Sequence, residues 1–181
     1  MAADHARLVT LLRQLSYRRM RVTLASGRES DFYVDGKQTT LNAEGAWLVA
    51  NGMLDLLMPG VAGVGGLVVG ADPIAGAIAA VSFQRGRPVH GFLVRKEAKG
   101  HGTARFVEGR ASLPDGAKVC VVEDTVTTGG SLLQAVARCR AEGLDVVQTL
   151  AIVDREEGGA DAIRAAGLPF AALVRRAELE S

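Results

Sequence analysis

Cysteine is scarce in this sequence. Only Cys120 and Cys139 occur among the 181 residues. They do not have the short spacing of a structural zinc site, so a cysteine-based metal motif is excluded. Cys120 falls on an expected buried strand and Cys139 on an expected helix. We therefore expect two reduced core thiols, as is usual in a cytoplasmic protein.

Long apolar runs and a strong charge imbalance are also lacking. No stretch approaches the roughly 18 apolar residues of a membrane span. The N-terminus lacks a positive patch followed by an apolar core, so we expect no signal peptide. The formal net charge is +1, which argues against a basic nucleic-acid binder. We expect no membrane and no nucleic acid among its partners.

What the sequence does contain is enough apolar material for a folded domain. Hydrophobic residues make up 48% of the chain, which argues against disorder. Short apolar runs alternate with helical patterns, and this predicts an α/β fold with a mainly parallel sheet flanked by helices. The expected strands are 64–69, 89–94, 119–122, 146–153 and 170–174. The expected helices are 42–58, one beginning at Pro73, one after Ser131, and 160–166.

The first 40 or so residues fall outside this alternation. Four leucines at helical spacing predict a first helix that closes at Arg18 and Arg19: Leu8, Leu11, Leu12 and Leu15. Strands are expected at 20–25 and 31–35. We interpret this segment as a small hood over one edge of the sheet. Residues 1–181 would then form a single domain.

The most informative stretch is 119–131, where a buried strand runs into a polar turn and a helix. The turn, residues 125–131, is called the phosphate turn below. Its hydroxyls, glycines and backbone N–H groups precede a helix N-terminus, an arrangement that favours a phosphate. Glu123 and Asp124 would repel that phosphate, but they suit neighbouring sugar hydroxyls or a hydrated Mg²⁺. The alternative is a capped strand-to-helix turn without a ligand.

This stretch is neither a Walker A loop nor a Gly-x-Gly-x-x-Gly dinucleotide turn. An apolar strand, two acids and a Thr/Gly-rich turn resemble the phosphoribosyl pyrophosphate (PRPP) motif of type I phosphoribosyltransferases. The resemblance implies the type I phosphoribosyltransferase fold. It also implies that PRPP contacts every residue from the first acid to the end of the turn: Glu123, Asp124, Thr125, Val126, Thr127, Thr128, Gly129, Gly130 and Ser131.

A second motif follows the strand at 89–94. Residues 95–110, called the cationic loop below, contain five Lys or Arg and two Glu, so their net charge is +3. Such a loop can neutralise a departing pyrophosphate and exclude water. The alternative is a solvated surface loop. The series Arg-Lys-Glu-x-Lys-x-His-Gly resembles the catalytic loop of orotate phosphoribosyltransferases. That resemblance places four residues on the pyrophosphate side, with Lys99 most important for rate: Arg95, Lys96, Lys99 and His101.

The same resemblance implies further properties. The family binds orotate through Thr127 and Arg155 at the matching positions, although an Asp-Arg pair at a strand end is also typical of a loop ion pair. Aromatic residues make up only 4% of the chain, so few bulky stacking groups surround such a site. The N-terminal segments 26–28 and 32–33 resemble the substrate side of the family. A homodimer is implied, with the cationic loop reaching the partner's site.

Two cations that many members carry are missing. Ala25 stands where a lysine often precedes Ser-Gly, and Gly70-Ala71-Asp72-Pro73 replaces a stretch with a Tyr-Lys pair. Lys37 is a candidate substitute for one of them. Mg²⁺ would be held mainly through PRPP, near Asp72 and Asp124.

The expected activity is transfer of the 5-phosphoribosyl group from PRPP to orotate, giving orotidine 5′-monophosphate and pyrophosphate in pyrimidine (UMP) biosynthesis. Glu123, Asp124 and Lys99 would be catalytic. Two alternatives stay open at this point. One is a phosphoribosyltransferase that uses a purine or uracil. The other is a PRPP-sensing regulator without activity, although no basic DNA-binding helix is apparent.

Overall fold

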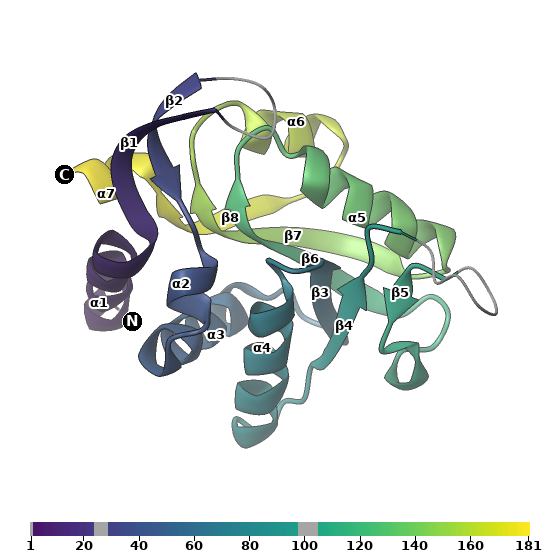
Figure 1. Cartoon of the computed structure of the whole chain (residues 1–181). Coiled ribbons are helices and arrows are strands. Elements are labelled where there is room, and N and C mark those ends of the chain that lie inside the picture. The colour runs from purple at the N-terminus through teal and green to yellow at the C-terminus, as the bar shows by residue number, and fades with distance from the viewer. Residues whose placement is uncertain (1, 24–28, 98–104) are drawn as a thin grey trace.

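A six-stranded sheet forms the centre of the molecule (Figure 1). The computed structural model describes residues 2–23, 29–97 and 105–181. The strands occur in the order β5-β4-β3-β6-β7-β8. Their bounds are β3 (Gly63–Leu67), β4 (His90–Val94), β5 (Val107–Glu108), β6 (Lys118–Val126), β7 (Asp145–Asp154) and β8 (Phe170–Arg175). Every pairing is parallel except that of β4 with β5, which confirms the expected α/β class.

Helices cover both faces of this sheet. In Figure 1, α3 (Ala43–Leu56) and α4 (Asp72–Gln84) lie below it, and α5 (Gly130–Ala141) and α6 (Gly159–Ala165) lie above it. Alternate residues of β6 therefore enter different cores. Cys120 joins the core beneath the sheet, and Val121 joins the core under α5 and α6. Because β6 is buried on both faces, its sequence is a continuous apolar run.

The strand order reverses between β3 and β6. From β3 the chain adds β4 on one side, and from β6 it adds β7 and β8 on the other. The connections after β3 and after β6 therefore leave the same edge of the sheet toward opposite sides. In open α/β sheets, ligands bind at such a point.

The N-terminal segment departs from the expectation in its details. Helix α1 (Ala2–Leu11) continues into a π-helical turn (Leu12–Ser16), and β1 (Tyr17–Thr23) follows directly. The prediction that Arg18 and Arg19 close the helix is wrong, because both pair with β2 (Glu29–Val34) in an antiparallel ladder. A short helix α2 (Lys37–Thr40), which the sequence did not predict, follows. Strands β1 and β2 form their own sheet, apart from the six-stranded one.

Other boundaries shift for physical reasons. Asn42 caps α3 as predicted, its side chain accepting a hydrogen bond from the Gly45 N–H at 3.0 Å. Pro73 lies in the first turn of α4, also as predicted. Strand β6 runs four residues past Val122, because pairing with β7 continues to Val126. The cationic loop contains β5, and a C-terminal helix α7 (Arg176–Glu180) was not predicted.

Both cysteines are buried free thiols. None of the helices in the described segments combines the length and the apolar character needed to cross a membrane.

A single buried amide ties α3 to the sheet. Gln148 of β7 is 6% exposed. Its Oε1 accepts from the Met58 N–H at 2.9 Å, and its Nε2 donates to the Leu56 carbonyl at 2.8 Å. These bonds satisfy backbone groups that the end of α3 leaves unpaired. The long strand and the helix end are thereby fixed to each other.

Replacing Gln148 with leucine should lower the free energy of unfolding by about 1–3 kcal/mol, because the Met58 N–H and the Leu56 carbonyl lose their partner. Urea denaturation of both proteins measures the change. The control is Gln84→Leu at the exposed end of α4, which should stay within about 0.5 kcal/mol of the parent. Equal losses for the two variants would contradict the structural role of Gln148.

Candidate active site

A cavity of about 240 Å³ opens at the carboxyl end of β6. It collects residues from β6, the phosphate turn, α5, the N-terminal sheet and the end of β7. The residues that line it are Tyr33, Val34, Glu123, Thr125, Val126, Thr127, Thr128, Gly129, Gly130, Ser131, Leu132 and Arg155. The structure therefore brings together the whole phosphate turn, one of the two predicted acids and the arginine after β7.

The phosphate turn owes its shape to Gly129. This residue is the N-cap of α5 and has φ = 81°, a left-handed conformation that glycine adopts without strain. The turn places the first N–H groups of α5 beside the cavity, where an anion can accept from them. The Thr125 hydroxyl is buried and has no hydrogen-bond partner among the described residues. A ligand in the cavity would satisfy these donors.

Glu123 and Asp124 occupy different sides of β6, as adjacent strand residues do. Glu123 lines the cavity, whereas Asp124 is absent from its lining. Asp124 lies instead against Gly36 and Gly70. A Cβ added at Gly36 would come within 2.7 Å of the Asp124 Cβ, and one added at Gly70 within 2.9 Å of its Oδ1. The segment after β2 and the connection after β3 therefore approach Asp124 so closely that only glycine fits.

Both carboxyl groups are held in surroundings that disfavour their charge. Burial, followed by the nearby Asp124, raises the pKa of Glu123 to about 8, and Lys96 offsets part of this effect. Burial also raises the pKa of Asp124, although Lys37 and a 2.8 Å hydrogen bond from the Thr125 N–H work in the opposite direction. In the absence of a ligand, Glu123 is therefore mostly protonated at neutral pH.

The connection after β3 contributes a third carboxylate. Asp72 lies in the first turn of α4, and burial raises its pKa. Its Oδ1 is buried without a hydrogen-bond partner in the described part of the chain. Lys37 lies near this region and forms an ion pair with Asp35 at 2.6 Å. Its pKa is raised, first by the hydrogen bond to Asp35 and further by the charge of Asp124.

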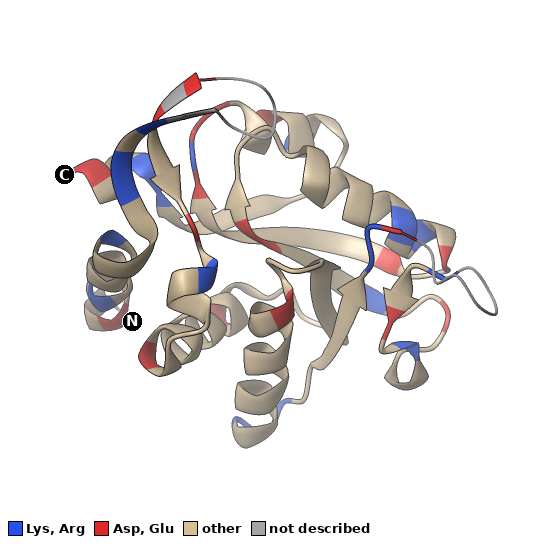
Figure 2. Cartoon of the chain, in the orientation of Figure 1, with Lys and Arg blue, Asp and Glu red and all other residues tan. Residues whose placement is uncertain are grey.

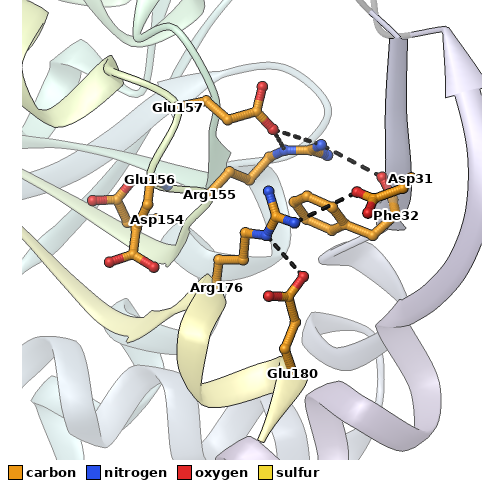
Figure 3. Close-up of polar contacts among 8 residues, drawn as sticks. All are labelled: Asp31, Phe32, Asp154, Arg155, Glu156, Glu157, Arg176 and Glu180. Carbon is orange, nitrogen blue, oxygen red and sulfur yellow. Dashed lines mark hydrogen bonds and ion pairs between the residues drawn. The ribbon is translucent and has the colours of Figure 1, made fainter.

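Arg155 is almost fully enclosed, with 2% of its surface exposed. Its Nε donates to Glu157 Oε1 at 2.9 Å, and its Nη2 lies 2.8 Å from the same oxygen (Figure 3). The guanidinium carbon lies 4.0 Å from the centre of the Phe32 ring. Arg155 therefore forms an ion pair, with Glu157 as its acid. Asp154, the acid of the Asp-Arg pair in the sequence, accepts from the Glu156 N–H.

A second arginine contacts the same ring. The guanidinium carbon of Arg176, from α7, lies 4.1 Å from the centre of the Phe32 ring. Arg176 also pairs with Glu180 at 2.8 Å and with Asp31 at 3.5 Å (Figure 3). Phe32 belongs to β2, so these contacts fix the N-terminal sheet beside Arg155 and the cavity.

The two ends of the cationic loop are described, and its centre is not. Arg95 and Lys96 follow β4 directly, where Figure 2 shows positive charge at the end of the strand. Arg95 pairs with Glu108 at 3.3 Å, and Lys96 is exposed. Lys99 and His101 lie outside the described residues, as do Ala25 and residues 26–28. The structure places four residues at or beside the site that were not predicted from the sequence: Val34, Gly36, Leu132 and Glu157. Of these, Glu157 carried a usable signal, an acid two residues after Arg155.

A comparison with models of protein families finds no match. Individual relatives match over nearly the whole chain. An orotate phosphoribosyltransferase of Sorangium cellulosum is 50% identical over 177 residues, covering 97% of this chain and 92% of that protein. One from Nostoc is 44% identical, covering 96% of this chain and 84% of that protein.

Solved structures agree. A crystal structure of Mycobacterium tuberculosis orotate phosphoribosyltransferase in complex with Fe(III) dicitrate has a TM-score of 0.85 and 44% identity, covering 98% of this chain and 99% of that one. The same enzyme in complex with PRPP has a TM-score of 0.80 and 40% identity, with the same coverage. Given this identity over almost the full length, the chain belongs to the orotate phosphoribosyltransferase family.

Proposed function

We propose that the cavity at the end of β6 is the active site in which the chain transfers the 5-phosphoribosyl group from PRPP to orotate. The products are orotidine 5′-monophosphate and pyrophosphate, in pyrimidine biosynthesis. One observation carries the assignment: the phosphate turn, Glu123 and Arg155 line the same 240 Å³ space. An anion site, a sugar-binding acid and a cation for a carboxylate thus lie within reach of one small molecule.

The phosphate turn would hold the 5-phosphate of PRPP. Its backbone N–H groups and hydroxyls can donate charge-assisted hydrogen bonds, each contributing roughly 1.5–3 kcal/mol. The unpartnered Thr125 hydroxyl supports this assignment. Binding at several points would fix the ribose and orient its anomeric carbon.

Glu123 and Asp124 would accept hydrogen bonds from the ribose hydroxyls. Bond breaking gives the ribose an oxocarbenium-like positive charge, and nearby carboxylates stabilise it. The raised pKa of Glu123 describes the site without ligand. Donors and positive charge next to the carboxyl favour its ionised form, so substrate binding should lower this pKa.

Mg²⁺ suits the acids around the connection after β3. Asp72 Oδ1 is buried without a described partner, and carboxylate oxygens are ligands that Mg²⁺ prefers. The described residues contain no group of three or more His, Cys, Asp or Glu that could hold a metal ion. We therefore assign the ion mainly to the oxygens of PRPP, with Asp72 and Asp124 beside it. When bound, Mg²⁺ neutralises charge on the leaving pyrophosphate.

Orotate would bind on the side of Thr127 and Arg155. A guanidinium can hold a carboxylate through two parallel bonds, which fits the one substrate group that uracil lacks. Arg155 is bonded to Glu157 in the structure, so the orotate carboxylate must compete with Glu157 or share the guanidinium with it.

The cationic loop would supply charge to the pyrophosphate. Arg95, Lys96, Lys99 and His101 are the assigned residues, with Lys99 the most important for rate. We also propose a homodimer in which this loop reaches the partner's site. Large apolar side chains exposed on the surface support an interface, among them Leu41 at 74% and Phe83 at 76%. Buried free thiols fit the proposed cytoplasmic location.

The activity itself is tested by following orotate consumption with PRPP, with and without Mg²⁺. We expect turnover with orotate that depends on the metal, and little with adenine, hypoxanthine or uracil. A preference for uracil or a purine would show that orotate is not the acceptor base. PRPP binding without turnover of any base would indicate a regulator.

Substituting Lys99 with alanine should lower kcat by about 100-fold or more, because the leaving pyrophosphate loses a compensating charge. Orotate binding should change by less than about threefold, since its proposed contacts lie at Arg155. Steady-state kinetics and orotate titration separate the two effects. Small, equal changes in both quantities would remove Lys99 from catalysis.

Glu123 should make the protein less stable as the pH rises. Its pKa is about 8 in the folded chain against an ordinary 4.5, so the folded state binds the extra proton between these values and loses that stabilisation as the pH increases. Between pH 5.5 and 8, the parent should lose about 3 kcal/mol relative to Glu123→Gln. Urea unfolding at both pH values measures this. Parallel losses in the two proteins would show that Glu123 is not buried in its protonated form.

A further inference from the structure

The two ends of the cationic loop meet beside α5. The Arg95 N–H donates to the Phe106 carbonyl at 2.8 Å, which closes the base of the loop. Beyond this bond, β4 and β5 pair, with Val94 opposite Val107. The base of the loop is thus a fixed structure, and its contacts with the rest of the chain decide where the loop begins and ends.

Arg138 holds the outgoing end. This half-buried residue lies in the last turn of α5. Its Nη1 donates to the Arg95 carbonyl at 2.6 Å and its Nη2 to the Lys96 carbonyl at 2.8 Å. The guanidinium also lies 4.5 Å from the centre of the Phe106 ring, on the returning end. The planar fork of arginine suits two neighbouring carbonyls, which a lysine could not bond in the same way.

Glu142 holds the returning end. It is the C-cap residue of α5, and its Oε1 accepts from the Phe106 N–H at 2.5 Å and from the Val107 N–H at 3.0 Å. A carboxylate at a helix C-terminus is unfavourable on its own, because the helix dipole is negative there. The two N–H donors offset that cost. Glu142 therefore stabilises the returning end of the loop more than it stabilises the C-terminus of α5.

We propose that Arg138 and Glu142 are positioning residues for the phosphoribosyl transfer. They fix both ends of the cationic loop to the last turn of α5, and the first turn of the same helix lines the cavity. A 12-residue helix is rigid and about 18 Å long. It therefore sets the placement of Arg95 and Lys96, the cations at the start of the loop, relative to the phosphate turn of the same chain. The inference rests on the proposed function, because it requires those cations to act in the reaction.

The mechanism is one of placement. A charge that must meet the leaving pyrophosphate loses much of its effect when displaced by about 1 Å. Loss of the Arg138 bonds would let Arg95 and Lys96 shift while the cavity residues stay in place. The expected signature is a lower kcat with an almost unchanged KM for orotate.

The test uses Arg138→Met, which keeps an unbranched apolar stem and removes the donors. Its matched control is Arg140→Met, the same change two residues away on an exposed face of α5. We expect Arg138→Met to lower kcat about tenfold, with the KM for orotate within about twofold of the parent. Arg140→Met should retain the parent kcat.

A double variant separates this inference from the proposed function. If Arg138 acts by placing Lys96, adding Arg138→Met to Lys96→Ala should lower kcat by no more than about twofold further. A full tenfold further loss would overturn the inference, because Arg138 would then act independently of Lys96. A Lys99→Ala variant with normal kcat would overturn the proposed role of the loop and this inference with it. A reduced kcat in Lys99→Ala but not in Arg138→Met overturns the inference alone.

Three further variants keep the test decisive if Arg138→Met folds poorly. Arg138→Lys retains the positive charge near Phe106 but not the forked pair of bonds, and its kcat should lie between those of the parent and Arg138→Met. Glu142→Gln keeps an acceptor oxygen, so it should retain more of kcat than Glu142→Met. The inference would be overturned if all four variants of Arg138 and Glu142 had the kcat of the parent, with melting temperatures matching the parent.

Discussion

The site depends on the burial of two adjacent carboxyl groups at the end of a strand that is itself buried on both faces. Taking such groups out of water disfavours their charge, and the raised pKa values of Glu123 and Asp124 reflect that cost. The chain offsets only part of it, with Lys37, Lys96 and the Thr125 N–H. In the proposed function, ribose hydroxyls and a metal-bound ligand would supply the missing donors.

Sheet topology explains why segments that are distant in the sequence meet at the carboxyl end of β6. The reversal of strand order between β3 and β6 leaves the ends of both strands open at the same edge. The connection after β3 meets Asp124 at Gly70, and the segment after β2 meets it at Gly36. Helix α5 then extends from the phosphate turn to the base of the cationic loop. The cavity and the base of the cationic loop therefore share one framework.

The parts of this site that the sequence predicted are those encoded locally. A buried strand, two acids and a glycine-bearing turn are consecutive, so their neighbours in space are their neighbours in sequence. The failure at Arg18 and Arg19 has the opposite origin, since pairing with β2 overrode the helical pattern. The distinction between Glu123 and Asp124 required knowing that β6 continues to Val126.

Contacts between residues far apart in the chain could not be predicted from the sequence. Gln148 meets the end of α3 some 90 residues away, and Arg138 and Glu142 meet the ends of the cationic loop. No local pattern marks such residues, because each is a common polar side chain on an ordinary helix or strand. Their roles follow from the backbone groups that other elements leave unpaired at that point.

The N-terminal segment and the last helix hold each other in place. His5 bonds Glu178 at 2.7 Å, and Arg13 donates to the Glu178 carbonyl at 2.5 Å. Arg176 of α7 lies against Phe32 of β2 (Figure 3). Because the neighbouring residues of β2 line the cavity, local unfolding of α7 would loosen the wall beside Arg155.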